Sequence, residues 1–221
     1  MNHDELIKAL YDETLMGNAP AVLELTNKAL AEGMGPDTIL FDALIPSLEE
    51  VGARFERGDY FVPEMLIAGK AMSGALKILR PLLAETGAES IGTYVMGTVK
   101  GDVHDIGKNL VNIMLEGAGF TVIDIGVQAA PEKFIDAIRE HKPDIVGMSA
   151  FLTTTMPMFK VNIHEITKAG LRDDVIIMVG GAPVTQEYAD AVGADGYAAD
   201  ASTAVRLAKE LIKRRRSLVS A

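Results

Sequence analysis

The stretch IGTYVMGTVKGDVHDIGKNLVNIMLEGA, residues 91–118, holds the pattern that decides the fold. Its first part, 91–99, is rich in apolar and β-branched residues and is bounded by polar residues, which predicts a buried strand. From Ile106 to Ala118, apolar residues recur at helical spacing, which predicts a helix. Between the two lies a loop that carries Asp102 and His104 and is flanked by glycines.

The remainder of the second half repeats this alternation of short β-rich runs with helices. Further strands are expected at 121–125, 145–148, 175–179 and, more weakly, 196–198, and helices at 131–140, 154–169, 185–191 and 201–215. Strands that alternate with helices of about 10 to 15 residues indicate an α/β fold with a Rossmann-like or flavodoxin-like, doubly wound parallel sheet of five strands. Ligands of such sheets bind beyond the carboxyl ends of the strands.

The first half of the chain has a different rhythm, with apolar residues at helical spacing in four blocks. The blocks run from Leu6 to Leu15, from Val22 to Leu30, from Ile39 to Phe55 and from Met65 to Leu79. They predict a small four-helix bundle, with a kink at Pro46 in the third helix and a stop near Pro81 in the fourth. We therefore expect a helical domain over 1–87 and an α/β domain over 88–221, joined by a linker, ETGAES, at 85–90.

Composition excludes several classes of protein. The chain has 221 residues, a net charge of −10 and no cysteine, so we expect neither a nucleic-acid partner nor a disulfide framework or thiolate metal site. No apolar run approaches the roughly 20 residues of a membrane helix, so no membrane association is expected and a cytoplasmic location is favoured. The basic cluster at 213–216 is interpreted as the solvated end of the last helix.

The pair Asp102 and His104 leaves three roles open for the histidine: metal ligand, half of an acid/base dyad, or ordinary loop residue. In an extended loop the two side chains can contact each other, and the carboxylate would fix the tautomer of the imidazole. A D-x-H pattern alone is weak, and hydrolysis is disfavoured because the chain has no G-x-S-x-G motif. A zinc site is disfavoured because the other three histidines, His3, His141 and His164, lie elsewhere. The loop matches neither GxGxxG nor a Walker motif. A single supported imidazole suits a metal that brings its other ligands with it, as in a macrocycle.

Three motifs in the second half carry a family resemblance. GDVHDIGKNLV at 101–111, SAFLT at 149–153 and VGGAPV at 179–184 resemble the cobalamin-binding domain, whose signature is D-x-H-x-x-G, then S-x-L, then G-G. One departure is Phe151, which stands where leucine is usual, with Leu152 following.

The resemblance implies that His104 is the axial ligand of cobalt in a corrinoid bound base-off/His-on, supported by Asp102 together with Ser149. Gly107 is expected to let its helix approach closely, and small residues at later strand ends are expected to make room for the nucleotide tail. The cofactor-binding residues implied in this half are Asp102, His104, Asp105, Ile106, Gly107, Ser149, Leu152, Thr153, Gly180 and Gly181.

The stretch VGARFERGDYFVPEMLIAGKAM, 51–72, resembles the helical cap of methionine synthase and of corrinoid proteins in anaerobic methyltransferase systems. The resemblance implies that Phe55, Val62, Met65 and Leu66 cover the reactive face of the corrinoid. The alternative is that Phe55 and Leu66 belong to the core of the bundle.

Together the two resemblances imply a non-catalytic methyl carrier that cycles between Co(I) and methyl-Co(III). Its implied partners are a cognate substrate:corrinoid methyltransferase, a second methyltransferase acting on tetrahydrofolate or a thiol coenzyme, and a reductive activase. A hinge is expected near residues 84–90. The alternatives are a cobalamin-responsive regulator, a cobalamin storage or delivery protein, and a mutase subunit, which the cap disfavours.

Overall fold

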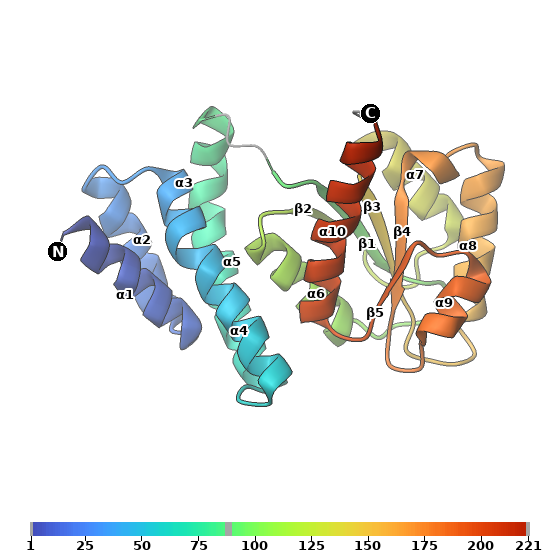
Figure 1. Cartoon of the computed structure of the whole chain (residues 1–221), viewed down its shortest axis with the longest axis horizontal. Coiled ribbons are helices and arrows are strands. Elements are labelled where there is room, and N and C mark those ends of the chain that lie inside the picture. The colour runs from blue at the N-terminus through green and yellow to red at the C-terminus, as the bar shows by residue number, and fades with distance from the viewer. Residues whose placement is uncertain (1, 87–89, 220–221) are drawn as a thin grey trace. The chain divides into compact units, whose positions relative to one another are not determined.

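The protein forms two compact units, shown in Figure 1, in a computed structural model that describes residues 2–86 and 90–219. The helical unit comprises Met1–Ser90 with Glu116–Gly119, and the sheet unit comprises Ile91–Leu115 with Phe120–Ala221. The expected boundary between 87 and 88, and residues 87–89 of the expected linker and hinge, lie outside the described residues.

The helical unit contains four long helical segments, in agreement with the four apolar blocks. They are α1 (His3–Leu15), α2 (Ala19–Ala31), the continuous segment made of α3 (Pro36–Thr38), η1 (Ile39–Leu44) and α4 (Ile45–Arg57), and α5 (Val62–Thr86). Asn2 begins α1 with a capping box, in which its side chain accepts from the Glu5 amide at 2.8 Å and the Glu5 carboxylate accepts from the Asn2 amide at 3.0 Å. Fully buried apolar side chains line the inner faces of these helices: Leu6, Leu10, Val22, Ile39, Leu44, Val51, Met65, Met72 and Leu79.

Two of the prolines of this unit, Pro46 and Pro81, are accommodated differently. Before Pro46 the chain forms a π-helical turn, in which the Ile45 amide bonds to the Leu40 carbonyl five residues back. The wider turn accommodates a ring that would otherwise crowd the preceding turn. Pro81 was expected to stop the last helix, and this prediction is wrong, because α5 continues to Thr86. Buried Leu79 and Leu83 hold the helix on both sides of Pro81, which is itself exposed, so water can satisfy the carbonyl that loses its partner.

The sheet unit confirms the predicted fold class. Its strands are β1 (Thr93–Thr98), β2 (Thr121–Asp124), β3 (Ile145–Ser149), β4 (Ile176–Gly180) and β5 (Gly196–Ala198). They form one parallel sheet in the order β2-β1-β3-β4-β5. The order reverses between β1 and β3, whose last residues, Thr98 and Ser149, are paired. A ligand site is expected at this switch point.

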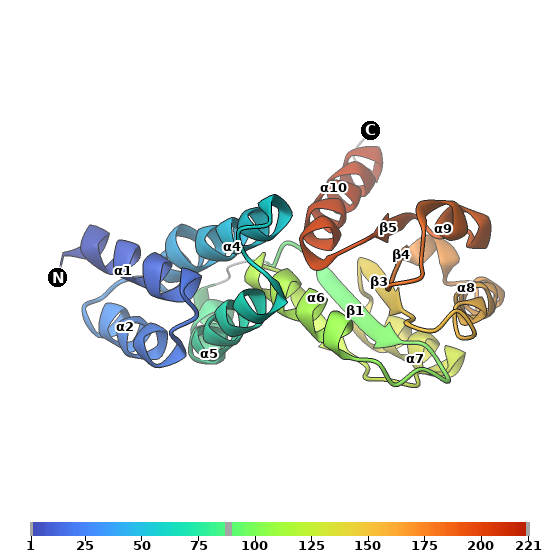
Figure 2. The same cartoon turned by 90° about the horizontal axis from the view of Figure 1, so that it is seen from below.

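Helices cover both faces of the sheet, as Figures 1 and 2 show. One face carries α6 (Ile106–Gly117) and α10 (Ala201–Val219), and the other carries α7 (Pro131–His141), α8 (Pro157–Lys168) and α9 (Gln186–Val192). The second face holds a core cluster that includes Val146, Ile177, Phe134 and Phe159. A short 3-10 turn, η2 (Arg172–Asp174), precedes β4.

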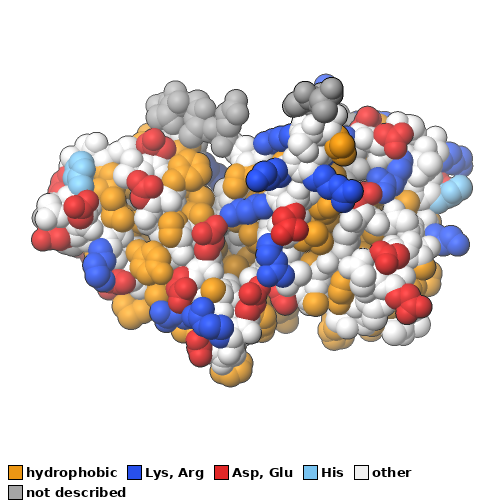
Figure 3. All heavy atoms as spheres, viewed as in Figure 1, with side chains coloured by type: hydrophobic (Ala, Val, Ile, Leu, Met, Phe, Trp, Pro, Cys, Tyr) orange, Lys and Arg blue, Asp and Glu red, His pale blue; other side chains and the backbone are white. Residues whose placement is uncertain are grey.

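The basic cluster lies at the end of α10, where Figure 3 shows Lys and Arg side chains gathered. Lys213, Arg214 and Arg216 are exposed, and Arg215 donates to the Asp173 carbonyl at 2.8 Å. These cations oppose the negative end of the helix dipole, as expected for a solvated helix end. Within the described residues, no helix is long and apolar enough to cross a membrane.

Replacing Gly147 with alanine should destabilise the protein. A Cβ atom at this position in β3 would overlap the ring of buried Tyr94 and approach the sulfur of Met96 at 2.6 Å. We expect a loss of about 1–3 kcal/mol in the free energy of unfolding, measured by urea denaturation of the cofactor-free chain. Gly107→Ala is the matched control, because a Cβ atom there meets nothing within 4 Å. Equal stabilities of the two variants would contradict this account of β3.

Candidate functional site

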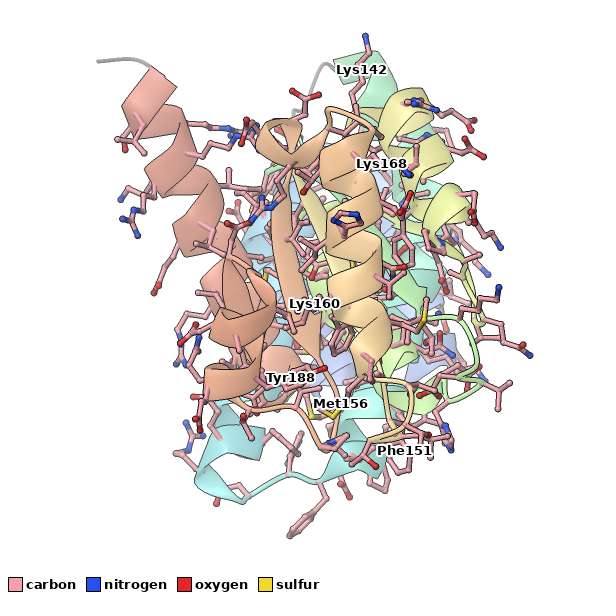
Figure 4. All side chains as sticks on the ribbon, turned by 90° about the vertical axis from the view of Figure 1, so that its right-hand side faces the viewer. Lys142, Phe151, Met156, Lys160, Lys168 and Tyr188 are labelled. Carbon is pink, nitrogen blue, oxygen red and sulfur yellow. The ribbon has the colours of Figure 1, made fainter. Side chains whose placement is uncertain are left out.

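The loops that follow β1 and β3 meet at the switch point of the sheet. The loop after β1 carries Asp102 and His104, and the loop after β3 carries Phe151 and Leu152. Figure 4 shows Phe151 and Met156 at one end of the sheet unit, and Lys142 and Lys168 at the other. The site therefore lies at the carboxyl edge of the sheet, where a parallel fold exposes its loops.

The carboxylate of Asp102 joins these two loops. Its side chain has no exposed surface. Oδ1 accepts from the backbone amide of His104 at 3.1 Å and faces Nδ1 of the same residue at 2.7 Å. Oδ2 accepts from the amides of Phe151 at 2.8 Å and Leu152 at 3.2 Å, and from the hydroxyl of Thr155 at 2.7 Å. Hydrogen bonds from two distant parts of the chain thus converge on one carboxylate.

These hydrogen bonds decide the charge of Asp102. Burial alone raises the pKa of this carboxyl, but the bonds from Thr155, from the amide and ring of His104 and from the Phe151 amide outweigh burial. The net result is a pKa well below the ordinary value for aspartate. Asp102 is therefore ionised at neutral pH and can only accept hydrogen bonds.

An ionised Asp102 fixes the tautomer of His104. Nδ1 must carry the proton that it shares with Oδ1, which leaves the lone pair of the neutral imidazole on Nε2. The side chain of His104 is 44% exposed, and within the described residues Nε2 has no hydrogen-bond partner. One face of the imidazole is stacked on the ring of Phe151, with centroids 4.3 Å apart and planes at 27°. The structure thus brings Asp102 and His104 into contact and presents a nitrogen that can bind a metal.

The sequence did not single out Thr155. We expected Ser149 to support the dyad with Asp102, but the hydroxyl that bonds Asp102 belongs to Thr155. Ser149 instead ends β3, where its carbonyl accepts from the Val99 amide at 3.0 Å. Three consecutive threonines, 153–155, follow β3, and the sequence offered no means of choosing among them. The predicted helix start at 154 was early, since α8 begins at Pro157 after a turn that Leu152 closes by accepting from the amides of residues 155 and 156.

The residues that follow His104 open α6. Asp105 accepts from the Asn109 side chain at 3.1 Å, and Ile106 is 68% exposed. Our reason for Gly107 was wrong: a Cβ atom there would meet nothing within 4 Å, so no close approach requires glycine. Open space, rather than tight packing, surrounds this position. The buried Lys108 is paired with Asp124 at the end of β2 and donates to Asn109 at 2.7 Å.

The other predicted residues lie at the ends of β3 and β4 or just beyond. Ser149 and Gly180 are paired across the two strands, and Thr153 is exposed in the turn before α8. Gly181 has a φ of +134°, and a Cβ atom there would overlap the carbonyl oxygen of Ala150. Glycine at 181 is therefore required by backbone conformation and by space.

Exposed apolar side chains flank the dyad on both loops. They are Val103 from the loop after β1, Ile106 from the start of α6, and Phe151 and Leu152 from the loop after β3. Exposed apolar side chains gathered around a polar group are typical of a ligand site.

The four residues predicted on the helical unit differ in exposure. Val62 is exposed, Phe55 and Leu66 are partly buried, and Met65 has no exposed surface. Their assignment to a cofactor remains a prediction. Phe61, which the sequence did not single out, is 65% exposed at the start of α5, where its amide donates to Glu64 at 3.0 Å.

The donor set fits a corrinoid better than a bare ion. No group of three or more His, Asp or Glu side chains that could hold a metal occurs in residues 2–86 and 90–219. A corrin ring supplies four nitrogens to its own cobalt, so one oriented imidazole with a free Nε2 suffices as the protein ligand. The exposed apolar side chains and the open space at Gly107 also suit a large, partly apolar ring with a tail.

Replacing Asp102 with asparagine should destabilise the cofactor-free chain at neutral pH by about 2–4 kcal/mol, because an amide cannot accept all the hydrogen bonds of a carboxylate. A lowered pKa in the folded state contributes stability above the unfolded value of about 4, and this contribution is lost as pH falls below it. The deficit of the Asp102→Asn variant should therefore shrink in acid. Urea denaturation at a series of pH values measures it, with Asp105→Asn as the exposed control. A deficit that grows in acid would contradict the assignment of the charge.

Comparison with protein families gives two matches. A model described as the B12 binding domain matches residues 92–206, and a second model of the same description matches residues 6–80. The first covers the sheet unit with the dyad, and the second covers most of the helical unit. Both units thus have counterparts in B12-binding proteins, and the bound cofactor is a corrinoid.

Known corrinoid proteins are similar to this chain over most of its length. Dimethylamine corrinoid protein 1 of Methanosarcina acetivorans is 42% identical over 213 residues, which are 96% of this chain and all of that protein. The trimethylamine corrinoid protein of Methanosarcina barkeri is 41% identical over 189 residues, which are 84% of this chain and 87% of that protein. The solved methanol:cobalamin methyltransferase complex MtaBC of Methanosarcina barkeri matches with a TM-score of 0.83 at 28% identity, covering 96% of this chain and 81% of that one. The chain therefore belongs to the B12-binding corrinoid proteins that serve as carriers in methyltransferase systems.

Proposed function

We propose that this chain binds a corrinoid with His104 as the lower axial ligand, in the base-off/His-on mode, and carries a methyl group between two methyltransferases. The observation that carries the proposal is the geometry of the dyad: Nδ1 of His104 lies 2.7 Å from the buried Asp102 carboxylate, and none of the residues in 2–86 and 90–219 bonds Nε2. The same carboxylate fixes the position of the loop after β3, so the ligand is held by both loops.

The corrinoid, when bound, supplies the cobalt centre that accepts and gives up the methyl group. The residues of this chain bind and orient that centre. Asp102 keeps the proton on Nδ1 and so keeps the lone pair on Nε2. Thr155 and the amides of Phe151 and Leu152 hold the carboxylate in place.

The remaining predicted residues are assigned to the body and tail of the corrinoid. The open space at Gly107 and the small residues at strand ends, Ser149, Gly180 and Gly181, support a path for the nucleotide tail, with Thr153 beside them. Asp105, Ile106 and Leu152 are assigned to the rim of the ring on the basis of their place beside the dyad. Phe55, Val62 and Leu66, which keep exposed surface, are assigned to the exclusion of water from the reactive face, whereas Met65 has no exposed surface and is assigned to the core of the bundle beneath them.

The methyl donor is proposed to be a methylamine, with dimethylamine as the first candidate. This step rests on the relatives, since dimethylamine corrinoid proteins match this chain at 42% and 43% identity over 96% of its length. The partners are then a methylamine:corrinoid methyltransferase, a second methyltransferase that passes the methyl group to a thiol coenzyme or tetrahydrofolate, and a reductive activase.

The ligand assignment is tested by electron paramagnetic resonance of the Co(II) form of the cobalamin-loaded chain. With 15N-labelled histidine we expect coupling of the unpaired electron to one imidazole nitrogen, and we expect the coupling to vanish in His104→Ala. His164→Ala is the matched control and should leave the signal unchanged. Coupling that persists in His104→Ala would reject His104 as the ligand.

The carrier role is tested by methyl transfer. The chain loaded with cobalamin and reduced should be methylated by a dimethylamine:corrinoid methyltransferase when dimethylamine is present, and the change in the visible absorption of the corrinoid reports it. Monomethylamine, trimethylamine and methanol, each with its own methyltransferase, are the comparison reactions. Methylation from methanol alone would overturn the donor assignment, and a loaded chain methylated by none of them would favour storage or delivery of cobalamin.

A further inference from the structure

The ring of Phe151 occupies one face of the His104 imidazole. The two centroids are 4.3 Å apart and the planes meet at 27°, so the rings are stacked. Phe151 is 51% exposed, so its ring lies at the surface of the loop and not in the core of the sheet unit. In the sequence, Phe151 also stands where the S-x-L motif places leucine.

Hydrogen bonds to the backbone bring the two stacked residues together. Oδ1 of Asp102 bonds Nδ1 of His104 at 2.7 Å, while Oδ2 accepts from the amide of Phe151 at 2.8 Å. The hydroxyl of Thr98 also donates to the carbonyl of His104 at 3.0 Å. The amide of His104 also donates to Oδ1 of Asp102 at 3.1 Å. One buried carboxylate therefore holds the main-chain segments that carry the two rings close to each other.

Stacking supplies a constraint that the hydrogen bond lacks. A single bond at Nδ1 fixes one point of the imidazole but still allows the ring to turn about the line between nitrogen and oxygen. Contact over one face of the ring opposes this rotation and so sets the plane of the imidazole. The Nε2 lone pair lies in that plane, so the stack determines the direction in which His104 can bind a metal.

We propose that Phe151 is a positioning residue, which stacks on His104 and holds Nε2 in its binding direction before the corrinoid arrives. The inference rests on the proposed function, because it gives Phe151 a task only if His104 is the ligand. Aromatic pairs of this kind change populations by about twofold to tenfold, which sets the size of the expected effect.

The stack itself is tested in the cofactor-free chain by nuclear magnetic resonance. The ring current of Phe151 should shift the carbon-bound ring protons of His104 upfield. In Phe151→Leu these resonances should move toward the positions of an unstacked histidine, whereas Phe151→Tyr should retain the shift. Identical His104 resonances in the leucine variant and the unmodified chain would overturn the proposal.

The positioning role is tested by a double-mutant cycle with Co(II) cobalamin as the probe. Phe151→Leu should raise the dissociation constant about twofold to tenfold in the chain that has His104, and Phe151→Tyr should restore it. In the His104→Ala background, Phe151→Leu should have no effect, because Phe151 acts through the imidazole. Circular dichroism of each variant checks that the fold is kept.

The outcomes separate this inference from the function on which it rests. If Phe151→Leu weakens cobalamin binding equally in both backgrounds, Phe151 contacts the corrinoid directly. If it weakens binding in neither background, the stack does not contribute to binding. Each result overturns the positioning role alone, provided that His104→Ala binds cobalamin more weakly than the unmodified chain. If His104→Ala binds cobalamin as well as the unmodified chain does, His104 is not the ligand and both proposals fail.

Discussion

The buried carboxylate of Asp102 is the constraint on which the rest of the site depends. A charge without exposed surface must be compensated, and here neutral N–H and O–H donors compensate it, in part from residues about fifty positions along the chain. The donors reach it because β1 and β3 are neighbours in the sheet and Thr98 is paired with Ser149 at their ends. The site thus exists only because the parallel order of the strands places these two loops together.

The use of neutral donors has a chemical consequence for the imidazole. Apart from the His104 ring itself, the groups that bond Asp102 are amides and a hydroxyl, so the negative charge is not cancelled by a cation. Oδ1 therefore belongs to an ionised carboxylate and lies beside the Nδ1 proton of His104. By contrast, the nearby Lys108 and Asp124 form a pair of opposite charges that links α6 to the end of β2. One carboxylate at this edge of the sheet orients an imidazole, while the other joins two elements of the fold.

Periodicity predicted most of the fold, because burial on one face leaves a regular trace in the sequence. The parallel sheet and its helices followed from the alternation of short apolar runs with helical patterns, and even the three-residue strand β5 was placed correctly. The contacts of single side chains were harder to predict from the sequence. Asp102 and His104 are two residues apart, so their contact could be inferred locally, whereas the bond from Thr155 depends on how the turn after β3 folds. The stack of Phe151 on His104 was also invisible, since it joins residues that only the sheet brings together.

The π-helical turn at Ile39–Leu44 has a consequence for the length of the chain in the helical unit. Such a turn holds about one residue more than an α-helical turn, and each residue of an α-helix turns the chain by about 100°. Removing one residue from this segment would let the turn revert to α-helical geometry, so the apolar stripe that follows, including Leu48 and Val51, would keep nearly the same direction. Removing one residue from α4 itself would instead rotate the part of that stripe beyond it by about 100°. A single-residue deletion should therefore be tolerated better within Ile39–Leu44 than within Ile45–Arg57, where the helical spacing of the apolar residues leaves no extra residue to lose.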